Sequence, residues 1–234
     1  MVRNIFLDLD DTVLDFTKAE RIAVARTLEE FGLKAEDRVL DRYHILNLYQ
    51  WKQLEKGLIT REQVKVRRYE NLFSEFGIEA DAAAAAAAYE RNLGIGHYFI
   101  PGAEAFLKWA AERYSLYMVS NGTATVQDQR IESAGIAGYF KGIYISEKLG
   151  KNKPSKEFFD LVFENIILDI DCKFSVSDSI IIGDSLTSDI KGGNGVGLRS
   201  VWFNMRGGKN DTDIIPDYTV KNFDELKGLL NSCL

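Results

Sequence analysis

Cysteine and histidine are scarce in this sequence of 234 residues. The two cysteines, Cys172 and Cys233, lie far apart and match no metal-ligand spacing, so they cannot form a disulfide framework. His44 and His97 show neither the spacing of a zinc site nor that of a catalytic triad. The shortage of cysteine is typical of a reducing environment, and we therefore expect a cytoplasmic protein.

Long apolar runs and an excess of positive charge are also missing. No uninterrupted apolar stretch reaches the roughly 18 residues that a membrane span needs, and the N-terminus turns acidic at once instead of resembling a leader peptide. The formal net charge is −6, whereas polymeric nucleic acid attracts clustered cations. We expect neither a membrane nor a polymeric nucleic acid as partner, and an anionic substrate would need a bound cation or a few placed basic groups.

What the sequence does contain is a series of short, almost wholly apolar runs rich in Ile, Val, Phe and Tyr. Such runs are typical of strands buried on both faces, and helix-like segments separate the later ones. Alternation of strands and helices predicts an α/β fold with a parallel sheet covered on both faces. The expected strands are 4–9, 115–120, 142–146, 179–184, 200–204 and 218–220, and the expected helices are 103–113, 123–134, 155–168, 185–194 and 222–231.

The gap between the first two expected strands contains no convincing strand and is much longer than a simple crossover needs. Thr60 and Gln63 form a capping-box pattern at the start of one expected helix, and the run Ala82–Ala88 is a strong helix former with no assigned function. The gap therefore predicts an inserted all-helical domain. Its expected helices are 17–31, 38–56, 61–76 and 80–93, its expected bounds are 16–98, and the α/β core would comprise 1–15 and 99–234.

Three aspartates, Asp8, Asp10 and Asp11, follow the first apolar run. Ligands of an open parallel sheet bind at the carboxyl ends of its strands. Asp8 and Asp10 would point the same way there, and two close carboxylates need a cation or a shared proton. A cluster of turn formers is the alternative, and it suits Asp11 best.

The second expected strand ends in Ser120, Asn121 and Gly122, directly before a helix. A hydroxyl group and free backbone amides at such a junction suit the oxygens of a phosphate. Ser-Asn-Gly is also an ordinary turn sequence, so this segment by itself leaves both interpretations open.

A lysine-rich segment follows the third expected strand, with Pro154 expected to open the next helix. Lysines in a run usually form a solvated surface. One of them could instead reach the same edge of the sheet, and the spacing favours Lys153 over Lys151 and Lys156.

The fourth expected strand runs directly into Gly183 and Asp184, and Asp189 follows five residues later. Packing gives no reason for an apolar strand to end on this pair. Carboxylates at a strand end are the hard oxygen ligands that Mg²⁺ takes, together with waters and phosphate. The sequence therefore predicts a Mg²⁺ site at the edge of the sheet.

These four motifs occur in order on successive strands, and together they resemble those of the haloacid dehalogenase superfamily. The resemblance implies a Rossmann-like core with the insert as a helical (C1-type) cap. It implies that Asp8 attacks phosphorus to form an aspartyl-phosphate, and that Asp10 acts as acid and base. The dehalogenases that name the superfamily lack this second aspartate, which favours a phosphatase.

The resemblance also implies a ligand set and a phosphate site. Mg²⁺ would be held by Asp8, the backbone carbonyl of Asp10 and Asp184, with Asp189 in support through water or hydrogen bonds. The transferring phosphoryl group would be bound by the remaining motif residues, namely Ser120, Asn121, Gly122 and Lys153.

Within the superfamily, the cap pattern Trp51, Glu55, Gly57, Ile59-Thr60 and Arg67-Arg68 is similar to that of bacterial pyrimidine 5′-nucleotidases of the house-cleaning type. The loop with Gly57 would reach the core site. A nucleobase would want an aromatic face, although each candidate could equally pack between cap helices. The candidates are Phe16, Tyr43, Tyr49, Trp51 and Tyr98.

The expected function is therefore a Mg²⁺-dependent phosphomonoesterase for a small phosphorylated metabolite, a pyrimidine nucleoside 5′-monophosphate. A sugar-phosphate phosphatase or phosphomutase uses the same core chemistry, and Lys52 leaves open a Schiff-base route for phosphonates. A non-catalytic phosphoacceptor switch is a remote alternative, because such domains lack a helical insert. The sequence leaves the oligomeric state open.

Overall fold

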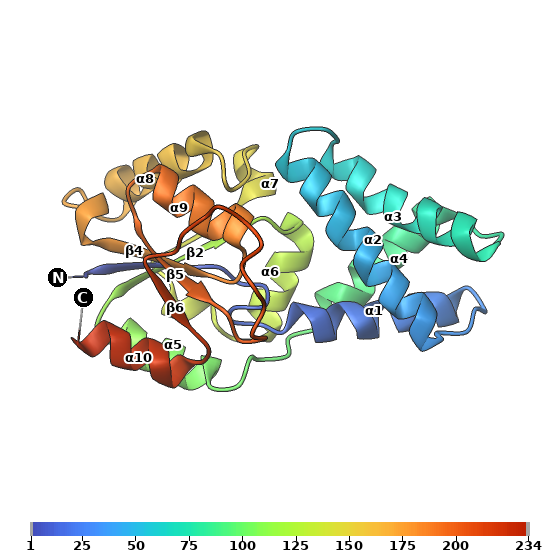
Figure 1. Ribbon diagram of the computed structural model, residues 1–234, viewed down its shortest axis with the longest axis horizontal. Coiled ribbons are helices and arrows are strands. Elements are labelled where there is room, and N and C mark those ends of the chain that lie inside the picture. Colours follow the sequence, from blue (N-terminus) through green and yellow to red (C-terminus); the bar gives the residue numbers. More distant parts are fainter. Residues whose placement is uncertain (1, 233–234) are drawn as a thin grey trace.

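The computed structural model describes residues 2–232, so Cys233 lies outside the described part of the chain. A twisted sheet of six strands stands beside a group of four helices (Figure 1). Every neighbouring pair of strands is parallel. In the order β3-β2-β1-β4-β5-β6, the strands are β3 (Gly142–Ile145), β2 (Ser115–Ser120), β1 (Asn4–Leu7), β4 (Ser179–Gly183), β5 (Arg199–Phe203) and β6 (Tyr218–Val220). The predicted Rossmann-like α/β core is confirmed.

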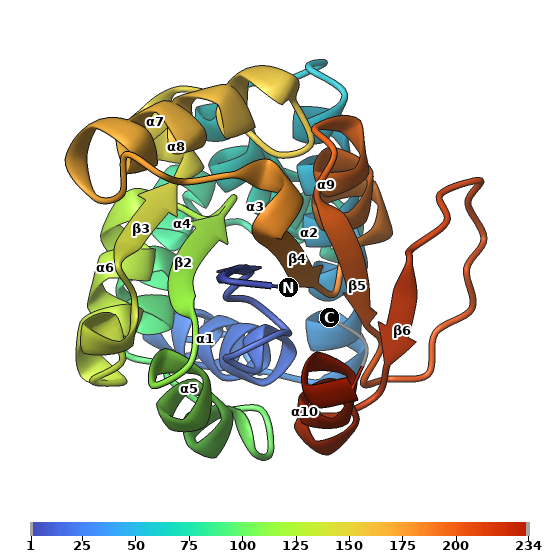
Figure 2. The same cartoon turned by 90° about the vertical axis from the view of Figure 1, so that its left-hand side faces the viewer.

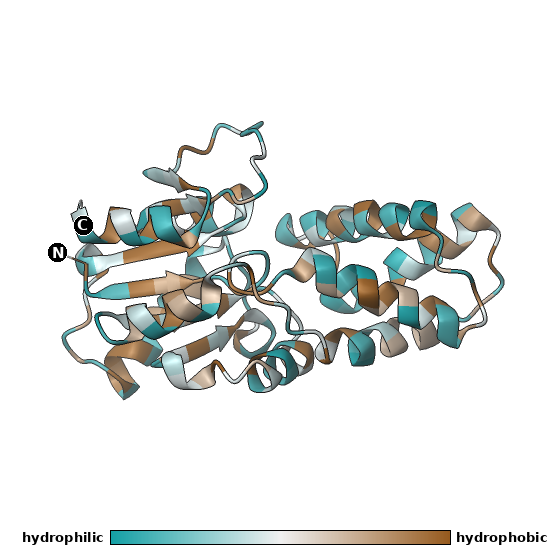
Figure 3. Ribbon diagram, turned by 90° about the horizontal axis from the view of Figure 1, so that it is seen from below, coloured by the Kyte–Doolittle hydropathy of each residue, from teal (hydrophilic) through white to brown (hydrophobic). Residues whose placement is uncertain are grey.

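Helices cover both faces of this sheet because successive strand side chains point to opposite faces. In β1, Phe6 joins the apolar cluster beneath α8 (Lys156–Asp169), whereas Ile5 and Leu7 join the cluster beneath α5 (Ala103–Ala111) and α10 (Phe223–Ser232). Figure 2 shows α8 on one side of the sheet and α5 and α10 on the other. In Figure 3 the strands are mainly apolar while the helices alternate between polar and apolar faces.

The inserted helices, called the cap below, have an apolar cluster of their own. Tyr43, Leu72 and Tyr89 are buried in it. Thr60 and Gln63 form the predicted capping box, and Gly77 ends the same helix at a φ of 63°. The cap helices are α1 (Phe16–Glu30), α2 (Asp37–Glu55), α3 (Arg61–Phe76) and α4 (Ala82–Gly94). The predicted all-helical insert is thus present, and the Ala82–Ala88 run begins α4.

The two chain segments that join the cap to the sheet run side by side. Leu14 and Phe99 form an antiparallel bridge, and Ile100 N donates to Val13 O at 3.0 Å. Helix α6 (Ala124–Ser133) also connects the two parts, because its Val126 packs in the cap cluster. The described chain begins and ends at the side of the sheet away from the cap (Figure 1).

Several predicted boundaries differ from the structure. Pro154 does not open a helix; α8 begins at Lys156, and Ser155 Oγ caps it by accepting from Phe158 N. The expected helix 185–194 begins as a π-helical turn, Leu186–Ile190, and continues as α9 (Lys191–Gly195). Three short helical segments were not predicted, namely Ala137–Tyr139, α7 (Ser146–Leu149) and Val176–Asp178. Within residues 2–232, no helix is both long and apolar enough to cross a membrane.

Candidate active site

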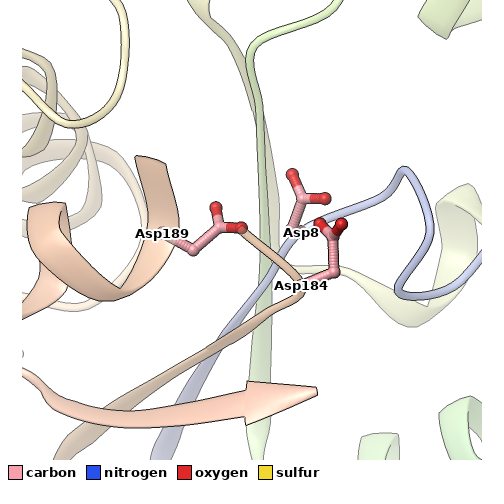
Figure 4. A group of neighbouring side chains, drawn as sticks. All are labelled: Asp8, Asp184 and Asp189. Atoms are coloured by element: carbon pink, nitrogen blue, oxygen red, sulfur yellow. The ribbon is translucent and has the colours of Figure 1, made fainter. Parts of the chain in front are cut away.

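Three carboxylates meet where β1 and β4 end. Asp8 follows β1, and its N–H donates to Ile182 O at 3.0 Å, while Asp184 follows Gly183 at the end of β4. One carboxylate oxygen from each of Asp8, Asp184 and Asp189 lies within 4.8 Å of the others. In Figure 4 the three side chains turn toward one another from separate segments. The sequence motifs predicted this convergence.

Gly183 is required by the close approach of Asp189. A Cβ atom at Gly183 would lie 2.3 Å from the carboxyl group of Asp189, a distance at which something must shift. The π-helical turn then returns Asp189 to the strand end, where Ser185 N donates to Asp189 Oδ2 at 3.1 Å. Glycine before Asp184 is therefore a packing requirement of the acidic cluster.

Lys153 joins the acidic cluster from the loop after α7. Its Nζ donates to Asp8 Oδ1 and Asp189 Oδ1, each at 2.6 Å, and to Val119 O at 2.7 Å. Burial lowers the pKa of Lys153, but the carboxylates of Asp189 and Asp8 outweigh it and raise the pKa above its ordinary value. The lysine is thus a charged donor beside the predicted nucleophile.

The cluster carries more negative than positive charge. The pKa of Asp8 is raised to about 8, mainly by burial; Lys153 opposes this rise, and the neighbouring Asp189 and Asp10 add to it. Burial also raises the pKa of Asp184 well above its ordinary value, with Asp8 adding to the effect. A cation placed among these groups would favour their charged forms.

The donor set fits Mg²⁺, which prefers carboxylate and carbonyl oxygens. Both carboxylate oxygens of Asp189 already accept hydrogen bonds, Oδ1 from Lys153 Nζ and Oδ2 from Ser185 N. Asp8 Oδ2 and the carboxylate of Asp184 make no hydrogen bond to residues 2–232. Asp8 and Asp184 therefore have oxygens free for an ion, and Asp189 is placed to orient Lys153.

Asp10 lies at the same edge, but α6 holds its carboxylate. Arg130 Nη1 forms an ion pair with Asp10 Oδ1, and Gln127 Nε2 donates to Asp10 Oδ2 at 2.7 Å. The fully buried Arg130 also donates through Nε to Gly96 O at 2.9 Å, in the second segment that joins cap and sheet. Neither Arg130 nor Gln127 could be singled out from the sequence, because both lie in an ordinary amphipathic helix.

Asp11, which was expected to act as a turn former, lines the same pocket and also makes contacts outside the acidic cluster. Its φ of 51° is a left-handed conformation that aspartate tolerates. Its carboxylate accepts from Thr17 N at 3.2 Å and from Arg206 Nη2 at 2.9 Å. Asp11 thus fastens the start of α1 to the loop after β5.

The Ser120–Gly122 segment lies at the end of β2, next to Lys153. Ser120 is buried, and its Oγ accepts from Gly122 N at 3.1 Å and from Gln127 Nε2 at 2.7 Å. The Asn121 side chain both donates to Lys153 O at 2.8 Å and accepts from Lys153 N at 2.9 Å. Asn121 and Gly122 line the pocket, whereas Ser120 is not among its lining residues.

The pocket above the aspartates extends into the cap. Phe16 and Trp51, both predicted to contact substrate, line it. Gly57 is exposed in the loop between α2 and α3 and does not line the pocket. The other cap residues on the pocket wall were not predicted as substrate contacts, and they are Leu48, Glu55, Arg68, Tyr89, Glu90 and Leu93.

Direct contacts close the cap onto the sheet. Arg61, at the start of α3, donates through Nη1 to Asn121 O at 2.7 Å and through Nη2 to Ser146 Oγ at 2.7 Å and Asn152 Oδ1 at 2.6 Å. Glu55 Oε2 accepts from Thr187 Oγ1 at 3.0 Å. These contacts lie across the pocket from the paired segments that join the cap to the sheet.

Residues 2–197 match the family of haloacid dehalogenase-like hydrolases. The chain is 38% identical over 229 residues to the HAD-hydrolase YfnB of Bacillus subtilis strain 168, covering 98% of this chain and 95% of that protein. It is 34% identical over 228 residues to the pyrimidine 5′-nucleotidase PynA of Streptococcus pneumoniae, covering 97% of this chain and 94% of that protein.

Solved structures agree with this assignment of fold. A magnesium-bound crystal structure of Bacillus subtilis YfnB, reported to reveal interdomain movement, has a TM-score of 0.92 at 37% identity and covers 98% of this chain and 99% of its own. A 2-haloacid dehalogenase from Pseudomonas syringae has a TM-score of 0.65 at 22% identity, with 99% of both chains covered. The latter likeness concerns the fold alone.

Proposed function

The chain belongs to the haloacid dehalogenase-like hydrolases, and on this premise we propose that it is a Mg²⁺-dependent phosphomonoester hydrolase acting through an aspartyl-phosphate. One observation carries the proposal. Asp8 has one oxygen held by Lys153 and the other free of hydrogen bonds to residues 2–232, while a second aspartate, Asp10, lies two residues on. A carboxylate oriented in this way is a suitable nucleophile for phosphorus.

In the first step, one carboxylate oxygen of Asp8 attacks phosphorus while the other stays available to a cation, and the bond from phosphorus to the leaving oxygen breaks. Asp10 gives its proton to that oxygen, so the product leaves as an alcohol. Lys153, beside Asp8, offsets the negative charge of the phosphoryl oxygens, and the Asn121–Gly122 turn lines the pocket where these oxygens would lie. A bound Mg²⁺, held by Asp8, Asp184 and the backbone carbonyl of Asp10, would supply positive charge to the phosphoryl group.

In the second step, Asp10 takes a proton from a water molecule as the water oxygen bonds to phosphorus. The bond between Asp8 and phosphorus breaks, and inorganic phosphate is released with Asp8 restored. Both steps need bulk water to be excluded, and the cap over the pocket is placed to do this. We propose that residues 16–98 move as this cap relative to a core formed by 1–15 and 99–234.

We further propose that the substrate is a pyrimidine nucleoside 5′-monophosphate in the cytoplasm. The relative PynA bears the name of a pyrimidine 5′-nucleotidase, as does YjjG of Escherichia coli at 27% identity over 226 residues. The cap side of the pocket supports this choice, since Phe16, Trp51 and Leu93 offer aromatic and apolar surface for a base.

Release of inorganic phosphate tests the proposal. The substrates are p-nitrophenyl phosphate, the pyrimidine 5′-monophosphates and hexose phosphates, each with Mg²⁺ and with a chelator. Asp8→Asn removes the nucleophile and should reduce phosphate release to background, whereas Asp160→Asn, on the exposed face of α8, should retain full activity.

Full activity in Asp8→Asn would contradict the nucleophile assignment. Undiminished activity in chelator would contradict the dependence on Mg²⁺. A strong preference for hexose phosphates over nucleotides would replace the nucleotidase with a sugar-phosphate phosphatase and leave the mechanism in place.

A further inference from the structure

A buried chain of hydrogen bonds crosses the cap and ends at the pocket wall. His44 Nδ1 and Glu20 Oε2 lie 2.5 Å apart, and Asn47 Nδ2 donates to Glu20 Oε1 at 2.5 Å. Asn47 Oδ1 in turn accepts from Arg68 Nη1 at 2.9 Å. Glu20 and Asn47 are buried, so the chain fixes the position of Arg68 from inside the cap.

Arg68 is a buried cation, and one of its guanidinium nitrogens makes no hydrogen bond to residues 2–232. Its side chain is 3% exposed, it lies over the ring of Tyr89 at 4.4 Å from the centroid, and its Nε donates to Lys65 O at 3.2 Å. Arg68 Nη2 makes no hydrogen bond to residues 2–232, and no carboxylate of these residues forms an ion pair with Arg68. Because Arg68 lines the pocket, this unused donor is available to an acceptor on a bound ligand.

The position of Arg68 on the pocket wall indicates the kind of ligand that would contact it. Arg68 belongs to the cap side of the pocket, while Lys153 and the aspartates belong to the sheet side. The cap side of the wall also contributes apolar surface through Leu48, Trp51 and Leu93. A ligand with its phosphate at Asp8 would therefore place a flat apolar body along this wall and an acceptor at Arg68.

The charge next to Arg68 favours a neutral acceptor. Glu90 lines the same pocket and forms an ion pair with Lys65 at 3.2 Å. A carboxylate on the ligand would add to the negative charge that Glu90 and the aspartates bring to this pocket, whereas a neutral acceptor would not. A ring carbonyl carries no net charge and accepts hydrogen bonds well, so it suits Arg68 without this repulsion.

We propose that Arg68 determines specificity by donating a hydrogen bond to a carbonyl oxygen of a pyrimidine base, and that Asn47, Glu20 and His44 position it. The inference rests on the proposed phosphatase function and identifies the residue that recognises the base of the substrate. Uracil, thymine and cytosine carry a ring carbonyl, whereas adenine carries none.

Steady-state kinetics with UMP and with ribose 5-phosphate, which has no base, separates recognition of the base from recognition of the phosphate. Arg68→Met should lower kcat/KM for UMP by about 10- to 100-fold, the range expected for a lost hydrogen bond to a charged group, and leave ribose 5-phosphate within about twofold. Arg68→Lys should recover part of the loss. Arg67→Met, at the exposed neighbouring position on α3, is the matched control and should change neither substrate.

The same contact is also tested with the wild-type protein and altered substrates. This second experiment does not depend on a variant that folds. Two UMP analogues are used, one with hydrogen in place of the 2-carbonyl oxygen and one with hydrogen in place of the 4-carbonyl oxygen. One of the two should lose about 10- to 100-fold in kcat/KM, because the hydrogen bond to Arg68 is then missing.

Equal losses for UMP and ribose 5-phosphate in Arg68→Met would show that Arg68 only supports the cap, and would overturn the inference. So would a wild-type protein that treats UMP, both analogues and ribose 5-phosphate alike. Absence of phosphate release from every substrate, p-nitrophenyl phosphate included, would instead overturn the proposed function itself.

Discussion

Asp8 and Asp10 lie two residues apart, yet different parts of the molecule hold their carboxylates. Lys153, from the loop after α7, holds Asp8, whereas Arg130 and Gln127 of α6 hold Asp10. The same α6 arginine donates to Gly96 O in the segment that joins the cap to the sheet. Arg130 is therefore a positioning residue for the proposed acid and base, and it links Asp10 to the base of the cap.

Replacing Arg130 should harm reactions that need a proton from Asp10 more than reactions that do not. We expect Arg130→Met to lower kcat/KM for UMP by about 10- to 100-fold, part of the contribution typical of general acid catalysis. The loss in kcat/KM with p-nitrophenyl phosphate should be smaller, because p-nitrophenolate leaves without protonation. The measurement is the ratio of the two kcat/KM values, which report the first step only, with the exposed Arg113→Met as control.

Equal losses for the two substrates, in an Arg130→Met protein that is folded by circular dichroism, would contradict a role through Asp10. Arg130 would then act only on the packing between α6 and the cap. Asp10→Asn, studied beside it, should show the same dependence on the leaving group, since both changes act on one proton.

At the scale of elements, the contact between α1 and α2 contains an ion pair that depends on pH. The hydrogen bond to Glu20 raises the pKa of His44 above its ordinary value of 6.5, against a smaller opposing effect of burial. Asp11 also raises this pKa, and Arg206 lowers it. A histidine with a raised folded pKa adds stability below its unfolded pKa and loses this contribution as the pH rises through the folded value.

We therefore expect His44→Gln to lower Tm more at pH 5.5 than at pH 9. At pH 5.5 the wild-type imidazolium pairs with Glu20, whereas at pH 9 the neutral ring contributes little charge interaction. Thermal unfolding across this range measures the difference. His97→Gln, outside the pair, is the control. A loss of Tm that is the same at both pH values would show that the ion pair adds nothing.

The acidic cluster depends on local backbone geometry as much as on the aspartates themselves. A π-helical turn at Leu186–Ile190 replaces the regular helix start that the sequence predicts, and it brings Asp189 back against Gly183. At the end of β2, Ser120 accepts a hydrogen bond from Gln127 of α6 and does not line the pocket. Such deviations arise from contacts between segments, so the local apolar pattern does not reveal them.

At the scale of the whole molecule, Arg61 closes the cap on the side opposite its connections to the sheet. Its guanidinium reaches Asn121 O after β2, Ser146 Oγ at the start of α7 and Asn152 Oδ1 in the loop after α7. The guanidinium of Arg61 lies over the ring of Trp51, 5.5 Å from the ring centroid. One cap residue therefore binds the loop that carries the proposed phosphate site, which couples closure to the arrangement of that loop.

Removing this contact should favour the open cap. We expect Arg61→Ala to raise the radius of gyration measured by small-angle X-ray scattering and to raise KM by about tenfold, since closure contributes binding energy only when it forms. Arg67→Ala, exposed on the same helix, should change neither quantity. An unchanged radius of gyration with unchanged KM would contradict a closing role for Arg61.

The sequence by itself determined the class of fold, the helical insert and the convergence of Asp8, Lys153, Asp184 and Asp189. Apolar periodicity and turn residues act over a few positions, so strands such as β2 (115–120) and helices such as α3 (61–76) could be predicted to their end residues. Parallel strands then bring the residues at their carboxyl ends together whatever the details of packing.

Only the tertiary structure decided which arginines matter. Arg61, Arg68 and Arg130 are buried, whereas Arg67 is exposed, and nothing in their immediate sequence separates them. Arg130 meets Asp10 across 120 positions of sequence. The burial of a charged group depends on partners from distant segments that satisfy its donors, and only the folded chain brings those partners together.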